Sequence, residues 1–510
     1  MSMNNIYITT PIFYVNDLPH IGHAYTTIIC DAIARFHNLN ETKVLFTTGT
    51  DEHGLKVEKA AKINGKNPME FVNEVSLNFK NLSEKLEIQN TDFIRTTEER
   101  HRLSATFFWK KLIDNNQIYK GNYKGWYSVK DESFYQEKEL VKKHNSFFTI
   151  DGSPVEWIEE ESFFFKLSEW GPKLLNFYEE HPEFIQPKSR MNEVKSFVKS
   201  GLKDLSVSRT SFSWGIKIPN SSNHIMYVWI DALTNYLTSL GYPKISEEKL
   251  SFWENTTHII GKDILKFHAV YWPAMLMAIN FPLPKFIFAH GWWTNEGKKI
   301  SKSLGNTIDP NHIIENYGID QFKYFLLREV PLGNDGDFSE NSMVARINSD
   351  LSNNLGNLIQ RVIKFINKNF DNSLPYSTDD DAEIHEIQAR GYELINIIKF
   401  KMEKFQISKT LEDIFIYIDE LNKFVDECEP WKSLKVNPEK AGKDLSILLE
   451  CFRIIGIILQ PFIPNAAEKI LDTLNIKDSE RYFRNLSNEF AIPRNHKLNN
   501  PNQLFPRYEK

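Results

Sequence analysis

The amino-terminal segment alternates between strand-like and helix-like patterns of apolar residues. A β-branched and aromatic run, Ile6-Tyr7-Ile8-Thr9-Thr10, is followed by a turn marked by Pro19 and Gly22. Val44-Leu45-Phe46 forms a second strand-like run. Between the two runs, the apolar positions that share one helical face are Ala24, Ile28, Ile29, Ala32, Ile33 and Phe36. This βαβ unit predicts an α/β fold with a Rossmann-type doubly wound parallel sheet.

The pattern changes over residues 115–220, which are rich in Phe, Trp and Tyr and carry short alternating runs. We expect an inserted connective subdomain there. The α/β pattern then resumes with two helices and two strands. Their expected ranges are 229–237 (helix), 258–260 (strand), 264–277 (helix) and 286–289 (strand).

From about residue 340 the apolar spacing is helical, which predicts an α-helical bundle. One core-facing stripe comprises Leu411, Ile414, Phe415, Ile418, Leu421 and Val425. A polar stretch at 371–381 predicts a loop. The expected domains are therefore 1–114 and 221–340 for the two halves of the sheet domain, 115–220 for the insertion and 341–510 for the bundle.

Composition limits the class of protein without naming its partner. Hydrophobic residues at 41% and charged residues at 25% are ordinary for a globular protein. The net charge of -6 neither indicates nor excludes nucleic acid. Three scattered cysteines predict no disulfide framework and a reducing compartment. With a strand near Met1 and no apolar run of about 18 residues, we expect a cytoplasmic protein with no membrane partner.

Two short motifs carry groups suited to a triphosphate. Pro19-His20-Ile21-Gly22-His23 lies at a predicted helix amino terminus, where free N–H groups and the helix dipole favour an anion. Lys299-Ile300-Ser301-Lys302-Ser303 supplies two ammonium groups and hydroxyl donors. Each motif alone is also compatible with ordinary solvated surface. A Walker loop is excluded, because Gly291 to Gly297 has the wrong spacing and is followed by Lys298-Lys299.

These motifs resemble the HIGH and KMSKS motifs of class I aminoacyl-tRNA synthetases, with Ile300 in place of Met. Further segments are similar to the methionyl-tRNA synthetase family, and the resemblance runs from Ile6 to Tyr508. The segments are Thr10–Asn16, Gly49–Gly54, Tyr227–Ala232, Gly261–Ile264, Asp350–Asn357 and Pro430-Trp431. The resemblance implies a Rossmann-type sheet, an insertion and a helical anticodon-binding bundle. It also implies ATP-dependent activation of L-methionine and its transfer to tRNA(Met), the initiator included.

The resemblance also implies roles for the residues around ATP. The catalytic residues would be His20, His23, Lys299 and Lys302. ATP would further contact Gly22, Lys262, Asp263 and Ser301, with Mg²⁺ sharing the phosphate charge. Catalysis would be positioning and charge stabilisation, since no protein nucleophile is required.

An amino-acid pocket is implied on two helical faces. Asp51 would pair with the α-ammonium group of methionine. The residues implied to line a narrow slot for the thioether are Ile12, Tyr14, Trp229, Ala232, Leu233, Tyr236, Ile264 and His268. Helical spacing cannot separate this pocket from ordinary core positions, and without the resemblance it favours the core.

The bundle carries an implied anticodon site. Trp431 would stack an unpaired base, with Asn357 and Arg361, four residues apart on one helical face, hydrogen bonding beside it. The alternative is that Trp431 belongs to the core.

Other functions are weighed on particular residues. A class I synthetase for another apolar amino acid would need an editing insertion, for which there is no room between His23 and Lys299. A cysteine-specific enzyme would need zinc thiolates that this chain lacks. A small nucleotidylyltransferase would not need the helical half, and an inactive tRNA-binding relative would not need both motifs.

Two departures from the family pattern bear on metals and assembly. Ser128 and Asp131 stand where many family members carry zinc-binding cysteines, so we expect no zinc or other resident metal. Aromatic packing around Trp126, Tyr127 and Phe134 would hold the insertion instead. The chain also stops soon after the bundle, so we expect a monomer.

Overall fold

The computed structural model describes residues 5–129, 133–135, 137–143, 146–150, 152–300, 306–378 and 384–509. The chain divides into two compact units: unit 1 comprises residues 1–30 and 44–290, and unit 2 comprises 31–43 and 291–510. Helix α1 (Ile21–Leu39) therefore begins in unit 1 and ends in unit 2. None of the helices in these residues is long and apolar enough to cross a membrane.

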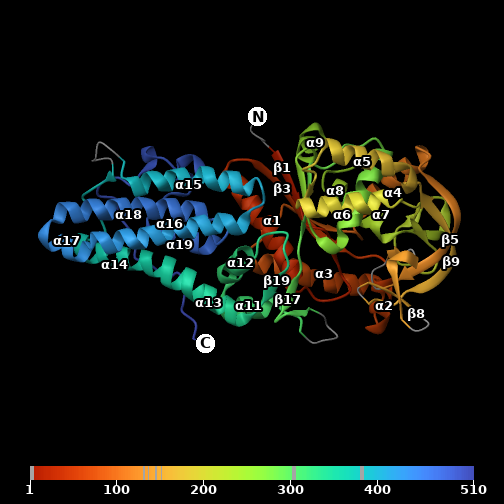
Figure 1. Cartoon of the computed structure of the whole chain (residues 1–510), viewed down its shortest axis with the longest axis horizontal. Helices are drawn as coiled ribbons and strands as arrows, with labels where there is room; N and C mark the ends of the chain where they lie inside the picture. The colour runs from red at the N-terminus through yellow and green to blue at the C-terminus, as the bar shows by residue number, and fades with distance from the viewer. Residues whose placement is uncertain are drawn as a thin grey trace. The chain divides into compact units, whose positions relative to one another are not determined.

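The described part of unit 1 is built around a 7-stranded sheet with the order β10-β16-β15-β1-β3-β2, and β4 pairs with β3 (Figure 1). The pairs β1/β15, β15/β16, β10/β16, β2/β3 and β3/β4 are parallel. The strands are β1 (Asn5–Thr9), β2 (Phe13–Tyr14), β3 (Lys43–Asp51), β4 (Asp92–Arg95), β10 (Ile185–Gln186), β15 (Thr256–Gly261) and β16 (Phe286–His290). The predicted α/β fold with a parallel sheet is confirmed.

Unit 1 also holds the helices that accompany this sheet. They are α2 (Leu55–Ile63), α3 (Pro68–Lys85), α4 (Glu99–Asp114), α5 (Gly171–Glu180), α6 (Lys188–Lys199), α7 (Val228–Leu233), α8 (Asn235–Thr238), α9 (Glu247–Trp253) and α10 (Trp272–Ala278). Helix α3 begins as its sequence dictates, with Asn67 accepting from the N–H of Glu70 and Pro68 in the first turn.

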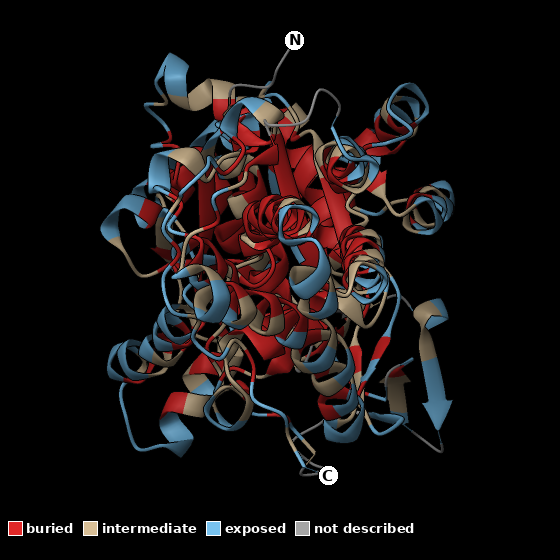
Figure 2. Cartoon of the chain, turned by 90° about the vertical axis from the view of Figure 1, so that its left-hand side faces the viewer, coloured by how far each residue is buried: buried red, intermediate tan, exposed pale blue. Residues whose placement is uncertain are grey.

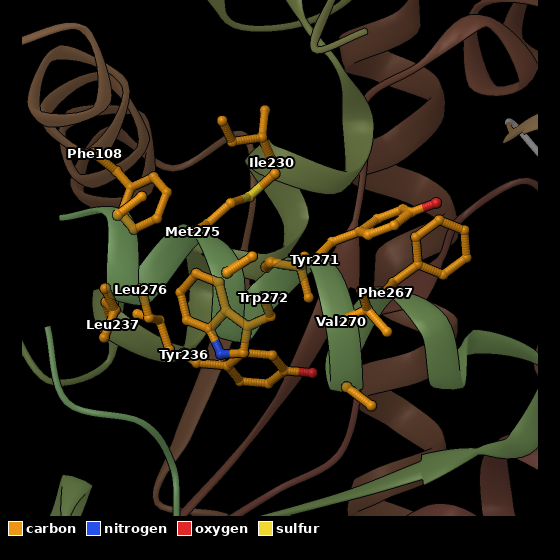
Figure 3. Close-up of a cluster of buried hydrophobic side chains, with 14 of the residues drawn as sticks. Phe108, Ile230, Tyr236, Leu237, Phe267, Val270, Tyr271, Trp272, Met275 and Leu276 are labelled. Carbon is orange, nitrogen blue, oxygen red and sulfur yellow. The ribbon is translucent and has the colours of Figure 1, made fainter. Parts of the chain in front are cut away.

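Two helices predicted as continuous are interrupted. The 229–237 helix is divided at Thr234 between α7 and α8. The 264–277 helix consists of a 3-10 turn, a π-helical segment over Phe267–Tyr271, and α10. The second interruption has a local cause: Pro273 has no N–H to donate to the carbonyl of Ala269, and the hydroxyl of Tyr178 donates there instead. Figure 3 shows the core around α10, with Tyr236 lying beside Trp272 and Phe267 beside Tyr271.

The insertion forms an antiparallel sheet with the order β11-β9-β5-β6. Its strands are β5 (Ile118–Ser128), β6 (Ser133–Tyr135), β9 (Glu156–Phe165) and β11 (Leu205–Ser206), beside a β7 (Leu140–Lys143) and β8 (Ser146–Thr149) hairpin and the small sheet β12 (Ser208–Arg209), β13 (Lys217–Ile218) and β14 (Ser221–Met226). The ring of Trp126 lies 4.6 Å from that of Phe147 and 5.2 Å from that of Trp157, so aromatic packing does support this sheet. Tyr127 is buried, and the side chain of Phe134 lies outside the described residues.

Unit 2 contains a small sheet and a series of helices. The sheet joins β17 (Trp293–Asn295), β18 (Lys298–Lys299) and β19 (Gly336–Phe338). The helices are α11 (Pro310–Tyr317), α12 (Ile319–Arg328), α13 (Glu340–Arg346), the π-helical η6 (Ile347–Gly356), α14 (Asn357–Phe370), α15 (Glu386–Met402), α16 (Ile407–Cys428), α17 (Pro430–Val436), α18 (Pro438–Leu459) and α19 (Pro464–Thr473). The predicted helical half is confirmed.

Burial in this half follows the predicted stripe. All six stripe positions on α16 are buried, and α18 is buried from Leu445 to Leu459. Figure 2 shows the same division, with inward helix faces in red and outward faces in pale blue. Helix α14 ends at Phe370, where Asp371 has φ 49°, and the predicted loop begins there; its last residues, 379–381, lie outside the described part.

Candidate active site

The turn before α1 places two imidazole rings against each other. The backbone N–H of His20 donates to Nδ1 of His23 at 3.0 Å, and the N–H of Gly22 donates to Nδ1 of His20 at 3.1 Å. The two rings lie 4.0 Å apart, and the His23 ring also meets Phe13 and Phe79 edge to face. These contacts fix both rings at the amino terminus of the helix.

The hydrogen bonds at Nδ1 define the chemical state of both rings. Because each Nδ1 accepts a backbone N–H, each neutral ring carries its proton on Nε2. Burial lowers the pKa of both histidines, and for His23 the neighbouring His20 lowers it further. The turn therefore presents two neutral N–H donors. The backbone N–H groups of Gly22, His23 and Ala24 are already bonded to His20 in this turn.

Gly22 is required by the position of the His20 ring. A Cβ at residue 22 would lie 2.9 Å from Cε1 and 3.1 Å from Nδ1 of His20. Any side chain there would displace the ring and break its hydrogen bond to the backbone. The position of the His20 ring thus gives a reason for glycine at residue 22, while the predicted contact of Gly22 with ATP stays a prediction.

The ends of two central strands lie close to this turn. Lys262 and Asp263 follow β15, and the Asp263 carboxylate folds over Gly261, where a Cβ would meet its Oδ1 at 2.5 Å. Asp263 also acts electrostatically on His20, whose pKa it raises against the larger effect of burial. At the end of β16, Nε2 of His290 lies 2.8 Å from Oγ1 of Thr26 on α1. The predicted nucleotide residues of unit 1 are therefore gathered at one edge of the sheet, as open α/β folds favour.

Asp51 ends β3 at the same edge of the sheet and is 7% exposed. Its backbone carbonyl accepts the N–H of Val15 at 3.2 Å. Tyr14 of β2 pairs with Asp51, and its hydroxyl donates to the carbonyl of His53 at 2.9 Å. Ile12, just before β2, is half-buried. The structure thus brings three predicted methionine-site residues onto adjacent strands.

The remaining predicted slot residues lie on α7, α8 and the segment after β15. Trp229 stacks face to face on Phe267, with ring centroids 3.7 Å apart and planes within 4°. The Tyr236 hydroxyl lies 2.7 Å from Nε2 of His268, whose Nδ1 faces the carbonyl of Ile264 at 3.1 Å. Since Nδ1 must donate to that carbonyl, Nε2 accepts from Tyr236. Burial lowers the pKa of His268 to about 4, so this ring is neutral.

Burial divides the slot residues into two groups. Ala232, Leu233, Tyr236 and His268 are buried, whereas Trp229 and Ile264 are half-buried. Phe267, which the sequence interpretation omitted, provides the stacking partner of Trp229. Its only signal was its place next to His268 in an apolar run.

The second motif lies mostly outside the described part of the chain. The backbone of Lys299 pairs with Thr294 between β17 and β18, but its side chain is not described. Ser301 and Lys302 fall outside the described residues. Their predicted contacts to ATP stay predictions.

The predicted anticodon residues are grouped in unit 2. Asn357 and Arg361 lie on α14, where Asn357 is exposed and Arg361 half-buried. The Arg361 guanidinium lies over the Trp431 ring, 5.5 Å from its centroid, and also faces Asp426 at 3.3 Å. Trp431, on α17, is half-buried and lies outside the buried core, which favours a platform over a core position.

Among the residues that the structure describes, no three His, Cys, Asp or Glu side chains form a group able to hold a metal ion. Ser128 is buried at the end of β5, and Asp131 lies outside the described residues.

Comparison with known families decides what this site belongs to. Residues 6–144 and 139–363 match the model of class I tRNA synthetases of the methionine type, and residues 375–510 match the anticodon-binding domain of methionyl-tRNA ligase. The chain belongs to the methionine–tRNA ligase family. It is therefore a class I aminoacyl-tRNA synthetase with an anticodon-binding domain, and the resemblance found in its motifs is confirmed.

Individual relatives match over their full length. The chain is 52% identical to the methionine–tRNA ligase of Rickettsia bellii, over 99% of this chain and 100% of that one. It is 47% identical to that of Brucella suis, over 100% and 99% of the two chains. Among solved structures, it matches methionyl-tRNA synthetase of Mycobacterium tuberculosis in complex with methionyl-adenylate with a TM-score of 0.95 and 42% identity, over 99% and 100% of the chains.

Proposed function

We propose that the chain joins L-methionine to the 3′ end of tRNA(Met), the initiator included, in two steps. The methionine carboxylate first attacks the α-phosphorus of ATP, the bond to the β-phosphate breaks, and diphosphate leaves. A terminal ribose hydroxyl of the tRNA then attacks the carbonyl carbon, and AMP leaves. The observation that carries this proposal is the pair of neutral histidine donors at the start of α1. They lie at the edge of the sheet where β3 ends at Asp51.

His20 and His23 would bind the triphosphate through Nε2–H. Neutral donors contribute hydrogen bonds without the cost of burying a charge in the free enzyme. Lys299 and Lys302 would stabilise the charge that grows on the β- and γ-phosphates, with Ser301 donating beside them. Gly22 would allow close approach of the nucleotide, and Lys262 and Asp263 would hold it beyond the end of β15.

Mg²⁺ enters this proposal only as a partner of ATP. Magnesium keeps several waters and binds substrate phosphates with one or two carboxylates, and no ready-made cluster of ligands exists among the described side chains. The residues that the structure describes therefore offer no ready-made magnesium site. Any Mg²⁺ would arrive with the triphosphate, and we assign it no separate step.

Asp51 would anchor the methionine ammonium group. The thioether would lie in the slot between α7–α8 and the segment after β15. Ile12, Tyr14 and Ile264 would flank it, Ala232 and Leu233 would form one wall, and Trp229, Tyr236 and His268 would supply polarisable surface. The hydrogen bond from Tyr236 occupies Nε2 of His268, so that edge offers methionine no free lone pair. This favours a side chain that carries no hydrogen-bond donor.

The anticodon would be read by unit 2. Trp431 would stack an unpaired base, and Asn357 and Arg361 would hydrogen bond beside it. We further propose that the protein acts as a cytoplasmic monomer. We keep the division 1–114, 115–220, 221–340 and 341–510 as a functional one. Two observations cross its boundaries: β10, within 115–220, pairs with β16 in the parallel sheet, and residues 291–340 group with the helical half by contact.

Charging of tRNA transcripts tests this proposal. With ATP and methionine, a tRNA carrying the methionine anticodon should be charged. The same transcript with one anticodon base changed should be charged about 5- to 150-fold more slowly, since a base edge that no longer matches its hydrogen-bonding partners costs about 1–3 kcal/mol. Equal charging of both transcripts would contradict anticodon recognition. No charging of either would contradict the ligase activity.

A further inference from the structure

The loop that follows Asp51 is held from two sides by buried charges. Glu52 is fully buried, and its carboxylate accepts from the Arg95 guanidinium at 2.7 and 3.1 Å and from the Thr50 hydroxyl at 2.8 Å. The hydroxyl of Thr97 donates to the same carboxylate. Glu52, the residue after Asp51, is thus fixed to β3, to the last residue of β4 and to the segment that follows it.

The other flank is fixed to α7 through His53. Nδ1 of His53 lies 2.7 Å from Oδ2 of Asp231, and the other oxygen of Asp231 lies 2.7 Å from Nε2 of His101 on α4. Asp231 and His101 are fully buried, and His53 is 5% exposed. Burial by itself raises the pKa of Asp231, but His53 and His101 outweigh it and lower the pKa to about 2. Asp231 is therefore ionised, and both histidines donate to it.

Asp231 lies between Trp229 and Ala232 in the helix that carries one wall of the thioether slot. His53 lies two residues after Asp51, and its carbonyl also accepts the hydroxyl of Tyr14. A single 2.7 Å hydrogen bond therefore joins the strand end that carries the ammonium anchor to the helix that carries the slot. Two further hydrogen bonds restrain this loop. Nε1–H of Trp214 donates to the carbonyl of Glu52 at 2.6 Å, and the N–H of Glu52 donates to Oγ1 of Thr96 at 2.9 Å.

We propose that Asp231 and His53 are positioning residues that set the distance between the ammonium anchor and the thioether slot, and so determine which length of amino acid is activated. The inference rests on the proposed role of Asp51. Neither residue needs to touch methionine, because His53 acts through the position of Asp51 and Asp231 acts through the position of α7. A carboxylate bound to two histidines is well suited to this, since removing one partner leaves a buried charge unsatisfied and the wall free to move.

Steady-state ATP–diphosphate exchange tests the proposal with His53→Ala, His53→Asn and Asp231→Asn. In His53→Asn the side-chain amide reaches the position of Nδ1 and can still donate to Asp231. We expect His53→Ala and Asp231→Asn to raise KM for methionine at least about 10-fold, with KM for ATP within about 3-fold of wild type, and His53→Asn to restore most of the loss. The preference for methionine over ethionine, which is longer by one methylene, should fall in the first two variants and return in His53→Asn.

Two controls separate the possible failures. Wild-type KM values and analogue preference in His53→Ala, even with a lower melting temperature, would overturn the positioning role, as would a parallel rise in both KM values. Asp51→Asn, measured alongside, tests the ammonium contact itself. Wild-type KM for methionine in Asp51→Asn would overturn that contact and the inference with it. A raised KM there with a wild-type His53→Ala would overturn only the coupling through Asp231.

Discussion

Nδ1 of His23 accepts the backbone N–H of His20 at 3.0 Å, so the ring that closes the turn before α1 must carry its proton on Nε2. This relationship separates two functions of one side chain. The Nδ1 edge holds the turn, and the proposed mechanism assigns the Nε2 edge to the triphosphate. Amide side chains of two lengths can test each edge separately.

His23→Asn and His23→Gln form that matched pair. Asn reaches the Nδ1 position and can keep the turn, while Gln reaches Nε2 and can keep the donor. We expect His23→Asn to keep its melting temperature but to lose on the order of 10²-fold in kcat for adenylate formation, as when one donor to developing charge is removed. His23→Gln should retain more activity. Wild-type kcat in His23→Asn would remove the Nε2 contact from the mechanism.

Gly22→Ala should displace the neighbouring His20 ring. The added methyl group would lie 2.9 Å from the His20 ring, so the ring must rotate away from the Gly22 N–H. We expect KM for ATP to rise several-fold while KM for methionine changes little. Gly171→Ala is the control, because its Cβ meets only Leu202 and Val198 at 3.8 Å in the first turn of α5. If both variants bind ATP like the wild type, the steric argument for Gly22 fails.

The free energy of unfolding should decrease as the pH falls below 6.5, the ordinary pKa of histidine. Burial lowers the pKa of His20, His23, His258 and His268 below 6.5, for His268 to about 4. Below pH 6.5 the unfolded chain therefore binds protons that the folded chain does not, so the free energy of unfolding falls toward acid. His268 alone should contribute a loss of about 2 kcal/mol between pH 7 and pH 5.

Urea unfolding of the wild type and of His268→Gln at pH 7, 6 and 5 measures this effect. Gln cannot bind the proton, so the pH dependence of its unfolding free energy should be shallower by about 2 kcal/mol over that range. The carboxylates with lowered pKa values, such as Asp231, titrate at more acidic pH and do not interfere. Parallel curves for the two proteins would contradict the buried neutral ring.

Trp431→Ala should separate the two reactions. Trp431 is half-buried beneath the Arg361 guanidinium, so its loss should leave methionine-dependent exchange and the melting temperature nearly unchanged while charging of tRNA falls about 10-fold or more. Trp253→Ala is the contrasting variant, because Trp253 is fully buried and its loss should cost about 3–5 kcal/mol of stability. A Trp431→Ala protein that melts early and loses both reactions would assign Trp431 to the core.

The sequence predicted the parts of the fold that repeat a simple period. The strands around Ile6, Val44, His258 and Phe286 and the buried stripe on α16 follow from apolar spacing. Apolar spacing predicts neither the break at Thr234 nor the π-helical segment over Phe267–Tyr271. At that segment Pro273 supplies no N–H, and the Tyr178 hydroxyl, distant in sequence, donates to the carbonyl of Ala269 instead.

The site residues were predicted from the family resemblance, and their contacts to ligands stay predictions. The resemblance pointed to Asp51, Trp229 and His268, and the structure groups them in unit 1. Asp231 was not among the predicted site residues, although a lone acidic residue in the apolar run Tyr227–Ala232 was a signal of a buried, paired carboxylate. His101 gave no signal, since only the fold places its ring against a carboxylate 130 residues away in sequence.

The most direct measurement of the central claim is ATP–diphosphate exchange by the purified protein with each of the twenty amino acids in turn. The Asp51 anchor and the slot bounded by Trp229, Tyr236 and His268 predict that methionine stimulates exchange far more than leucine, isoleucine, valine or cysteine. Equal or greater stimulation by a branched amino acid, or no exchange with any of the twenty, would contradict the account.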